Sequence, residues 1–164
     1  MSNKPIKRHP ALQALSREHH YGLLFCWKIR EGFKRNIALE RIKKYSDWFW
    51  DNYLMNHFAE EEKHLFVILA DENDKVKKAI TQHRKLKRLF ENNKEAYISL
   101  NLIEEELEKH IRFEERILFN EIQQTVKEEQ LKLFEKIHLH IPEPKFPSFF
   151  HAGFLYSRML KLNY

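Results

Sequence analysis

Apolar residues recur at intervals of three and four along most of the chain, which is the spacing of helices with one buried face. Four such stripes are marked by Leu12, Leu15, Leu23, Cys26 and Phe33; by Trp50, Leu54, Leu65 and Ile68; by Val76, Ile80, Leu86 and Phe90; and by Ile103, Leu107, Leu118 and Ile122. Polar breaks near residues 35–36, 71–74 and 92–93 separate them, and Ser16 could cap the first helix or begin its regular part. Because short connections make neighbouring helices antiparallel, we expect an all-α, up-down-up-down four-helix bundle.

The C-terminal part of the chain differs from the four stripes. A shorter extra helix is expected over residues 128–139, and from Pro142 onward prolines and aromatic residues dominate. We therefore predict a bundle domain over residues 1–141, with its core at about 12–125. The remaining residues, 142–164, form a predicted extension that packs on the bundle or on a second subunit of a homodimer.

Composition excludes several other classes of protein. The chain has only three glycines and five prolines, and no proline lies between residues 11 and 141. This leaves too few turn residues for a β-rich fold and no glycine-rich phosphate-binding loop. The 13 phenylalanines argue against disorder. The net charge of +5 comes from basic residues scattered among acidic ones, so we expect a solvated surface and no nucleic-acid partner.

Cysteine content and hydropathy bear on the compartment. Cys26 is the only cysteine, which excludes a disulfide framework and is typical of a reducing compartment. The first residues lack the apolar core of a signal peptide, and the longest apolar run, 65–70, is far shorter than the roughly 18 residues of a membrane span. We therefore expect a cytoplasmic protein that does not bind membranes.

Histidines and glutamates occupy positions that the periodicity assigns to the core. They are His19 in the first stripe, His57 and Glu61 in the second, His83 in the third, and His110 and Glu114 in the fourth. Burying so many polar groups is costly unless each is paired, and a metal centre would pair them all. The expected helix lengths allow this, because the histidines would differ in depth by only about 4–6 Å at 1.5 Å per residue.

The second and fourth stripes carry an internal repeat. Residues 57–66 (HFAEEEKHLF) align without gaps on residues 110–119 (HIRFEERILF). In both segments a histidine is followed four residues later by a glutamate, which places the two side chains on one helix face. Each copy also follows a helix that carries a histidine. Two matched helix pairs predict a pseudo-twofold site in which Glu61 and Glu114 bridge two metal ions.

The order His, His-x-x-x-Glu, His, His-x-x-x-Glu resembles the hemerythrin-like HHE cation-binding domain family, over roughly residues 12–125. The resemblance implies a four-helix bundle that holds a non-haem di-iron centre. It also implies that the glutamates bridge the two irons and that four histidines are terminal ligands, namely His19, His57, His83 and His110.

One position departs from the oxygen-carrying hemerythrins, whose third helix supplies His-x-x-x-His. The fourth residue after His83 is Lys87, so one iron would lack a histidine. His20 and His64 are the candidates to replace it, and His20 could also take the place of His19, although His19 continues the apolar stripe. The lost histidine favours sensing or redox chemistry over reversible oxygen carriage.

The other polar residues near these positions have simpler interpretations. Glu62 and Glu115 are expected to be solvated or to hold ligands through hydrogen bonds. The histidines that lie off the four stripes are expected at the surface, and these are His9, His138, His140 and His151.

Imidazole and carboxylate ligands suit iron, manganese or zinc, and the mixture with bridging glutamates favours iron over structural zinc. We expect a protein that binds or senses dioxygen, nitric oxide or peroxide, or that handles iron. One alternative is a small di-iron oxidoreductase or a protein similar to iron-sulphur repair factors. A ferritin-like carboxylate bundle, suggested by Glu61-x-x-His64 and Glu135-x-x-His138, would leave three histidines unexplained. A metal-free helical interaction module is the remaining alternative.

Overall fold

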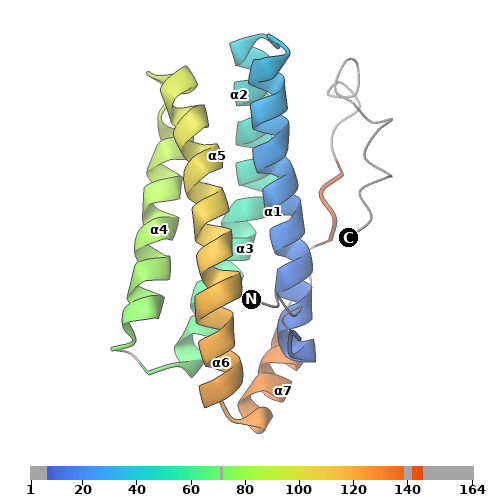
Figure 1. The fold of residues 1–164 in the computed structure, drawn as a ribbon, viewed down its shortest axis with the longest axis vertical. Coiled ribbons are helices and arrows are strands. Elements are labelled where there is room, and N and C mark those ends of the chain that lie inside the picture. Colours follow the sequence, from blue (N-terminus) through green and yellow to red (C-terminus); the bar gives the residue numbers. More distant parts are fainter. Residues whose placement is uncertain (1–6, 71, 139–141, 146–164) are drawn as a thin grey trace, which may run out of the picture.

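The computed structural model describes residues 7–70, 72–138 and 142–145, and every regular element within these ranges is helical. The elements are α1 (Pro10–Lys34), α2 (Leu39–Phe49), η1 (Trp50–Leu54), α3 (Met55–Glu60), η2 (Glu61–Leu65), η3 (Phe66–Ile68), α4 (Asp74–Glu91), α5 (Ala96–Phe113), η4 (Glu114–Leu118), α6 (Phe119–Thr125) and α7 (Glu128–Ile137). The long helices lie side by side along the long axis of the molecule (Figure 1). The prediction of an all-helical fold is therefore confirmed for the described residues.

Helix α1 begins earlier than its sequence suggested. Pro10 is its first residue, a position where the missing N–H costs no hydrogen bond. The ring of His9 caps the helix, because its Nδ1 accepts a hydrogen bond from the backbone N–H of Ala11 at 3.1 Å. Ser16 lies inside the helix, so it neither caps α1 nor begins its regular part, and both predictions for it are wrong. The helix ends before Asn36, whose φ of 54° is left-handed, a conformation that asparagine tolerates.

The helices of the second half begin and end close to their predicted limits. Asn73 caps α4, since its side chain accepts hydrogen bonds from the backbone N–H groups of Lys75 and Val76. The extra helix α7 is present and ends at Ile137, two residues before its predicted end. Of the predicted extension, residues 142–145 have no regular structure and residues 146–164 lie outside the described ranges.

Three π-helical segments interrupt the α-helical course of the chain. Two of them, η2 and η4, begin at the glutamates of the two His-x-x-x-Glu motifs and occupy the same place in the internal repeat. The third, η1, lies one turn before His57. A π-helical turn admits an extra residue and is often found at functional sites. The structural repeat thus extends to the local distortion of the backbone.

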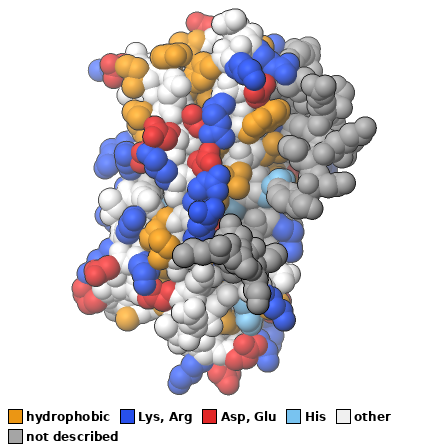
Figure 2. Space-filling model, viewed as in Figure 1, with side chains coloured by type: hydrophobic (Ala, Val, Ile, Leu, Met, Phe, Trp, Pro, Cys, Tyr) orange, Lys and Arg blue, Asp and Glu red, His pale blue; other side chains and the backbone are white. Residues whose placement is uncertain are grey.

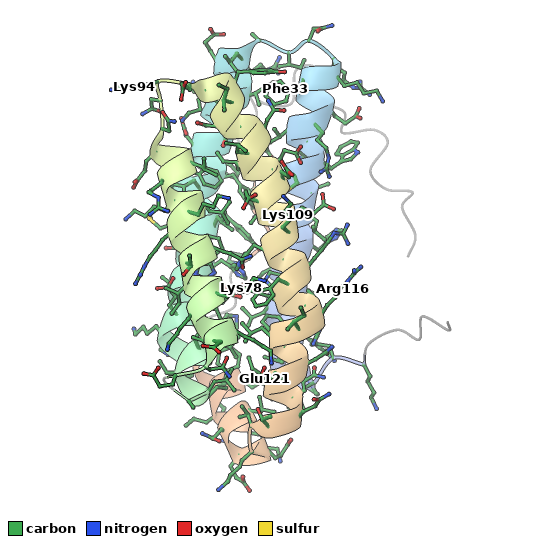
Figure 3. All side chains as sticks on the ribbon, turned by 60° about the vertical axis from the view of Figure 1, so that its left-hand side comes forward. Phe33, Lys78, Lys94, Lys109, Arg116 and Glu121 are labelled. Carbon is green, nitrogen blue, oxygen red and sulfur yellow. The ribbon has the colours of Figure 1, made fainter. Side chains whose placement is uncertain are left out.

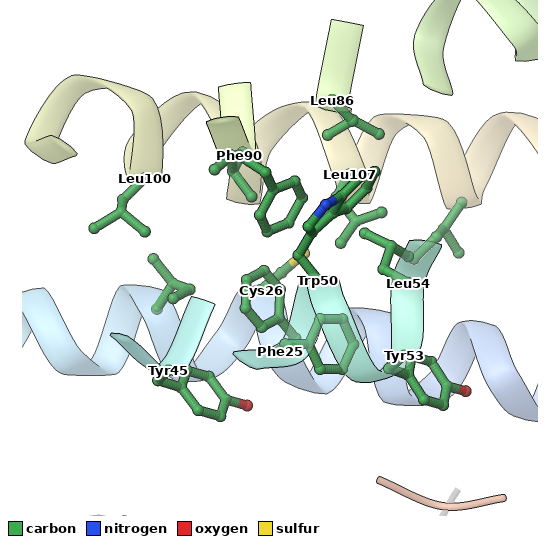
Figure 4. Close-up of a cluster of buried hydrophobic side chains, with 14 of the residues drawn as sticks. Phe25, Cys26, Tyr45, Trp50, Tyr53, Leu54, Leu86, Phe90, Leu100 and Leu107 are labelled. Carbon is green, nitrogen blue, oxygen red and sulfur yellow. The ribbon is translucent and has the colours of Figure 1, made fainter. Parts of the chain in front are cut away.

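Two apolar clusters fill the interior. One is built around Phe25, Cys26, Trp50 and Phe90, several of which are shown in Figure 4. The other lies nearer the α7 end and includes Leu12, Leu65, Val76, Phe119 and Phe134. Along each long helix, the predicted ligand residues lie where the residues of one cluster give way to those of the other. A polar layer is therefore held between two apolar ones.

The surface carries basic and acidic side chains side by side, as one face shows (Figure 2). Arg30 illustrates the pattern, because its guanidinium lies 2.7 Å from a carboxylate oxygen of both Glu104 and Glu108. Side chains project both inward and outward from the helices (Figure 3). In the part of the chain that the structure describes, no helix combines the length and apolar character needed to cross a membrane.

Candidate metal centre

The six predicted ligand residues meet in the polar layer and form two overlapping groups. Position A comprises His19, His57, Glu61 and Glu114, and position B comprises Glu61, His83, His110 and Glu114. In each group the potential ligand atoms lie within 4.8 Å of one another. All six residues are buried, with at most 3% of their surface exposed. Sequence reasoning therefore found every member of both groups.

Glu61 faces both positions through different oxygens. Its Oε1 lies 3.5 Å from Nε2 of His19 and 3.4 Å from Nε2 of His57. Its Oε2 lies 3.4 Å from Nε2 of His83. One carboxylate thus has one oxygen directed at each group, which is the arrangement of a bridging ligand.

Glu114 occupies the corresponding place in the second half of the repeat. Its Oε2 lies 3.1 Å from Nε2 of His19 and 3.3 Å from Nε2 of His110, and its Oε1 lies 3.8 Å from Nε2 of His83. The Nε2 atoms of His83 and His110 are 3.1 Å apart. All four imidazoles therefore direct Nε2 toward the two carboxylates.

The other nitrogen of each imidazole has a partner outside the two groups. The Nδ1 contacts are His19 to Glu115 at 2.7 Å, His57 to Glu18 at 2.8 Å, His83 to Glu62 at 2.8 Å, and His110 to Gln82 at 3.0 Å. An Nδ1–H that donates to such an acceptor leaves Nε2 free of a proton and fixes the ring, which is how proteins orient histidine ligands. The prediction that Glu62 and Glu115 hold ligands through hydrogen bonds agrees with these contacts.

One matched pair of aromatic rings covers the layer, and a third ring has no aromatic counterpart in the repeat. Phe66 stacks on His83 with ring centroids 5.7 Å apart, and its counterpart in the repeat, Phe119, stacks on His19 at 5.3 Å. Phe58 lies closer still to His83, at 3.8 Å and an interplanar angle of 11°. These rings exclude water from the polar layer, so charges within it are weakly screened.

Several atoms that face the centre of the layer have no hydrogen-bond partner within the described structure. They are Nε2 of His19, Nε2 of His57 and both carboxylate oxygens of Glu61 and Glu114. Leaving a buried polar atom unsatisfied costs about 1–3 kcal/mol, and more when the group is charged. Divalent cations would satisfy all of these atoms at once. The donor set therefore fits a pair of metal ions.

The carboxylates have pKa values shifted in opposite directions. Burial and the nearby charge of Glu61 raise the pKa of Glu114 to about 7. Burial also acts to raise the pKa of Glu61, but the neighbouring His57, His19 and His83 outweigh it and hold that pKa well below its usual value. The two glutamates thus share one negative charge more readily than they carry two.

The imidazoles differ in the same way. Burial acts to lower the pKa of His83, but hydrogen bonds with Glu61 and Glu62 outweigh it and raise the pKa to about 9. Burial and the adjacent His83 hold the pKa of His110 well below its usual value. Protons therefore supply part of the positive charge that the carboxylates need, and metal ions would displace them.

The proposed substitutes for the missing histidine are not part of either group. His20 is exposed, and His64 lies with its Nε2 4.0 Å from Glu60 on the same helical stretch. Lys87, which stands where a histidine was expected, has a 60% exposed side chain. Each position therefore has two histidines and two shared glutamates. The ferritin-like motifs are not assembled, since His64 is outside both groups and Glu135 is exposed.

His138 was expected at the surface, and this prediction is wrong. Its side chain is only 3% exposed, and its Nε2 lies 3.2 Å from Oε1 of Glu18. Burial acts to lower the pKa of His138, but the hydrogen bond with Glu18 and the nearby Glu60 and Glu61 raise it above its usual value. The stripe pattern missed His138 because it follows α7, outside the four main helices. His9 also differs from a free surface residue, as it caps α1, and His140 and His151 lie outside the described residues.

An open pocket of about 550 Å³ reaches the layer from one side of the bundle. Its lining includes His19 of position A together with Tyr21, Ile111 and Glu115. A small molecule in this pocket would contact a predicted ligand without passing through either apolar cluster.

Comparison with known proteins gives no further assignment, as no protein-family model, curated protein or solved structure matches the chain.

Proposed function

We propose that the chain is a hemerythrin-like protein with a non-haem di-iron centre that binds or senses dioxygen, nitric oxide or peroxide. The observation that carries the proposal is the pair of buried groups with two histidines each, joined by Glu61 and Glu114. A single metal in either position would use four of the six ligand residues and leave two histidines unused. Two metals bridged by both carboxylates would use every one of them.

The course of the chain supports a hemerythrin-like, up-down-up-down topology. In Figure 1, α1, the stretch from α2 to η3, α4 and the stretch from α5 to α6 follow one another in alternating directions. This topology would bring the first and second halves of the repeat together around a pseudo-twofold axis. The matched π-helical segments at the two glutamates support the same arrangement.

The ligand chemistry favours iron. Structural zinc sites usually have four protein ligands and no shared ones, whereas nitrogen and bridging carboxylate ligands are typical of redox-active iron pairs. When bound, such a pair would supply reversible one-electron chemistry toward small oxygen- or nitrogen-containing molecules. Manganese is the next candidate on the same donor set.

The protein would contribute orientation, exclusion of water and access. The Nδ1 contacts fix each imidazole, and the stacked phenylalanines keep bulk water out of the layer. The pocket beside His19 is open to the surface, and its volume of about 550 Å³ admits a small solute. These features favour binding of a diatomic molecule or peroxide over catalysis on a large substrate.

Metal analysis of protein purified without oxygen tests the proposal. We expect about two irons per chain and, after addition of dioxygen or nitric oxide to the reduced protein, a new charge-transfer absorption. A long-lived adduct supports a binding or sensing role, and rapid reoxidation with turnover of peroxide supports the oxidoreductase alternative. Protein that binds no metal, or only one tightly held zinc, contradicts the di-iron proposal.

A further inference from the structure

The two metal positions have the same ligand types but differ in what lies behind one pair of histidines. Oε2 of Glu18 accepts a hydrogen bond from Nδ1 of His57 at 2.8 Å. At the matched place in the repeat, Oε1 of Gln82 accepts one from Nδ1 of His110 at 3.0 Å. The sequence thus places a carboxylate behind His57 of position A and a neutral amide behind His110 of position B.

This exchange changes the donor strength of the histidine. A carboxylate carries a full negative charge, so it polarises the Nδ1–H bond more than an amide does and makes Nε2 more basic. Burial strengthens the effect, because the side chain of Glu18 has no exposed surface. Gln82 is half-buried and uncharged. His57 should therefore hold a divalent cation more tightly than His110.

Further contacts also fix Glu18 in place. Besides the contact with His57, its Oε1 lies 3.2 Å from Nε2 of His138, and its backbone carbonyl accepts a hydrogen bond from the hydroxyl of Tyr53 at 3.1 Å. Nδ1 of His138 in turn lies 3.6 Å from Glu60. The residue after α7 thus orients the carboxylate that orients His57.

The other two histidines, His19 and His83, do not reverse this difference in metal affinity between the two positions. His19 is backed by Glu115, whose side chain is 25% exposed, and His83 is backed by Glu62, whose side chain is 42% exposed. Arg8 lies 2.7 Å from Glu115 and offsets part of its charge. Since this pair has a carboxylate on both sides, the contrast between the positions comes chiefly from Glu18 and Gln82.

We propose that Glu18 makes position A the tighter of the two metal positions, so that position A fills first when the metal-free protein is loaded. This inference rests on the proposed two-metal function. Glu18 is a positioning residue, because it acts on the metal through His57.

Stepwise loading of the metal-free protein with Fe(II) under anaerobic conditions, in competition with a coloured chelator, tests this. For the unmodified chain we expect two dissociation constants that differ by about tenfold or more, in line with the effect of such hydrogen-bond partners on metal affinity. Glu18→Gln should weaken the first step by about 10–100-fold. Gln82→Glu should tighten the second step and bring the two constants together.

Two histidine variants assign the steps. His110→Ala should leave one binding step with the constant of the original first step, whereas His57→Ala should leave one weaker step. Circular dichroism of each metal-free variant verifies that the helices are retained. If the protein binds two irons and Glu18→Gln leaves both dissociation constants unchanged, this inference is overturned but the proposed function is not. A protein that binds no iron overturns the proposed function as well.

Discussion

The two halves of the internal repeat deliver the same ligands but cover them differently. In the first half Phe58 stacks flat on His83 at 3.8 Å. Its counterpart in the second half is Ile111, which packs against α1 and lines the open pocket beside His19. Position B is therefore closed by an aromatic ring, while position A borders a pocket. The comparison teaches that a repeat can fix the ligands of a centre while substitutions around them give its two positions different access.

The largest effect should follow from removing a residue that both positions share. Glu61→Ala takes one oxygen from each position and leaves the facing imidazoles without a common partner. We expect the metal content to fall from about two ions per chain to less than one, because each position loses one of its four donors. Metal analysis after anaerobic loading measures this. Glu105→Ala is the matched control, because this exposed glutamate forms an ion pair with Lys109 at the surface and lies outside both metal positions, so the variant should keep both metals.

Unchanged metal content in Glu61→Ala would show that Glu61 does not bridge the two positions. If Glu61→Ala emptied one position and left the other filled, the two halves would be independent sites, which contradicts the shared centre.

The second largest effect should come from acidification, which should lower the affinity for metal ions. Only the deprotonated carboxylate and imidazole bind metal, and in the metal-free protein the pKa of Glu114 is raised to about 7 and that of His83 to about 9. The affinity should therefore fall as the pH is lowered from 9, and more steeply below pH 7, where both groups must lose a proton. Chelator competition at a series of pH values measures this. An affinity that is constant from pH 9 to pH 6 would contradict the coupling of proton release to metal binding.

A smaller effect is expected where α1 and α5 approach each other. A methyl group added at Gly22 would lie 2.7 Å from Cδ1 of Ile111, so Gly22→Ala forces that side chain to move. Overpacking costs about 1–3 kcal/mol, and the better helix propensity of alanine offsets about 1 kcal/mol of it. We expect the free energy of unfolding of the metal-free protein, measured with urea, to fall by about 0–2 kcal/mol.

The double variant sharpens this result. Ile111→Val removes Cδ1, so adding Gly22→Ala to it should raise the free energy of unfolding by up to about 1 kcal/mol. If alanine at position 22 destabilised both backgrounds equally, the contact with Ile111 would not be the cause.

Much of the fold and of the site could be predicted from periodicity and spacing. His57 and Glu61 are four residues apart in a helix, so their place in the core and on a common face followed from the stripe that contains them. The π-helical turns at Glu61 and Glu114 could not be predicted, because a period of 3.6 residues assumes an undistorted helix. His138 was missed for a related reason, since it approaches Glu18 only through the placement of α7 in space.

The start of α1 differs from its prediction for the opposite reason, because a local signal marks it more strongly than the apolar stripe does. Pro10 with His9 before it marks a helix start by its missing N–H and fixed φ, whereas Ser16 is preceded by residues that already continue the apolar stripe. The predicted substitutes for the missing histidine are close to ligands in sequence, His20 next to His19 and His64 three residues after Glu61. His20 stands outside both groups because adjacent residues on a helix point in different directions. His64 lies in the π-helical segment that begins at Glu61, where the α-helical spacing of three does not hold.

The central claim is that one layer holds two metal ions between the same two carboxylates. A crystal structure of the anaerobically iron-loaded protein, with anomalous data at the iron edge, tests it most directly. We expect two anomalous peaks about 3.5–4 Å apart, one between His19 and His57 and one between His83 and His110, with both Glu61 and Glu114 contacting each peak. A single peak, or two peaks that share neither glutamate, would contradict the account.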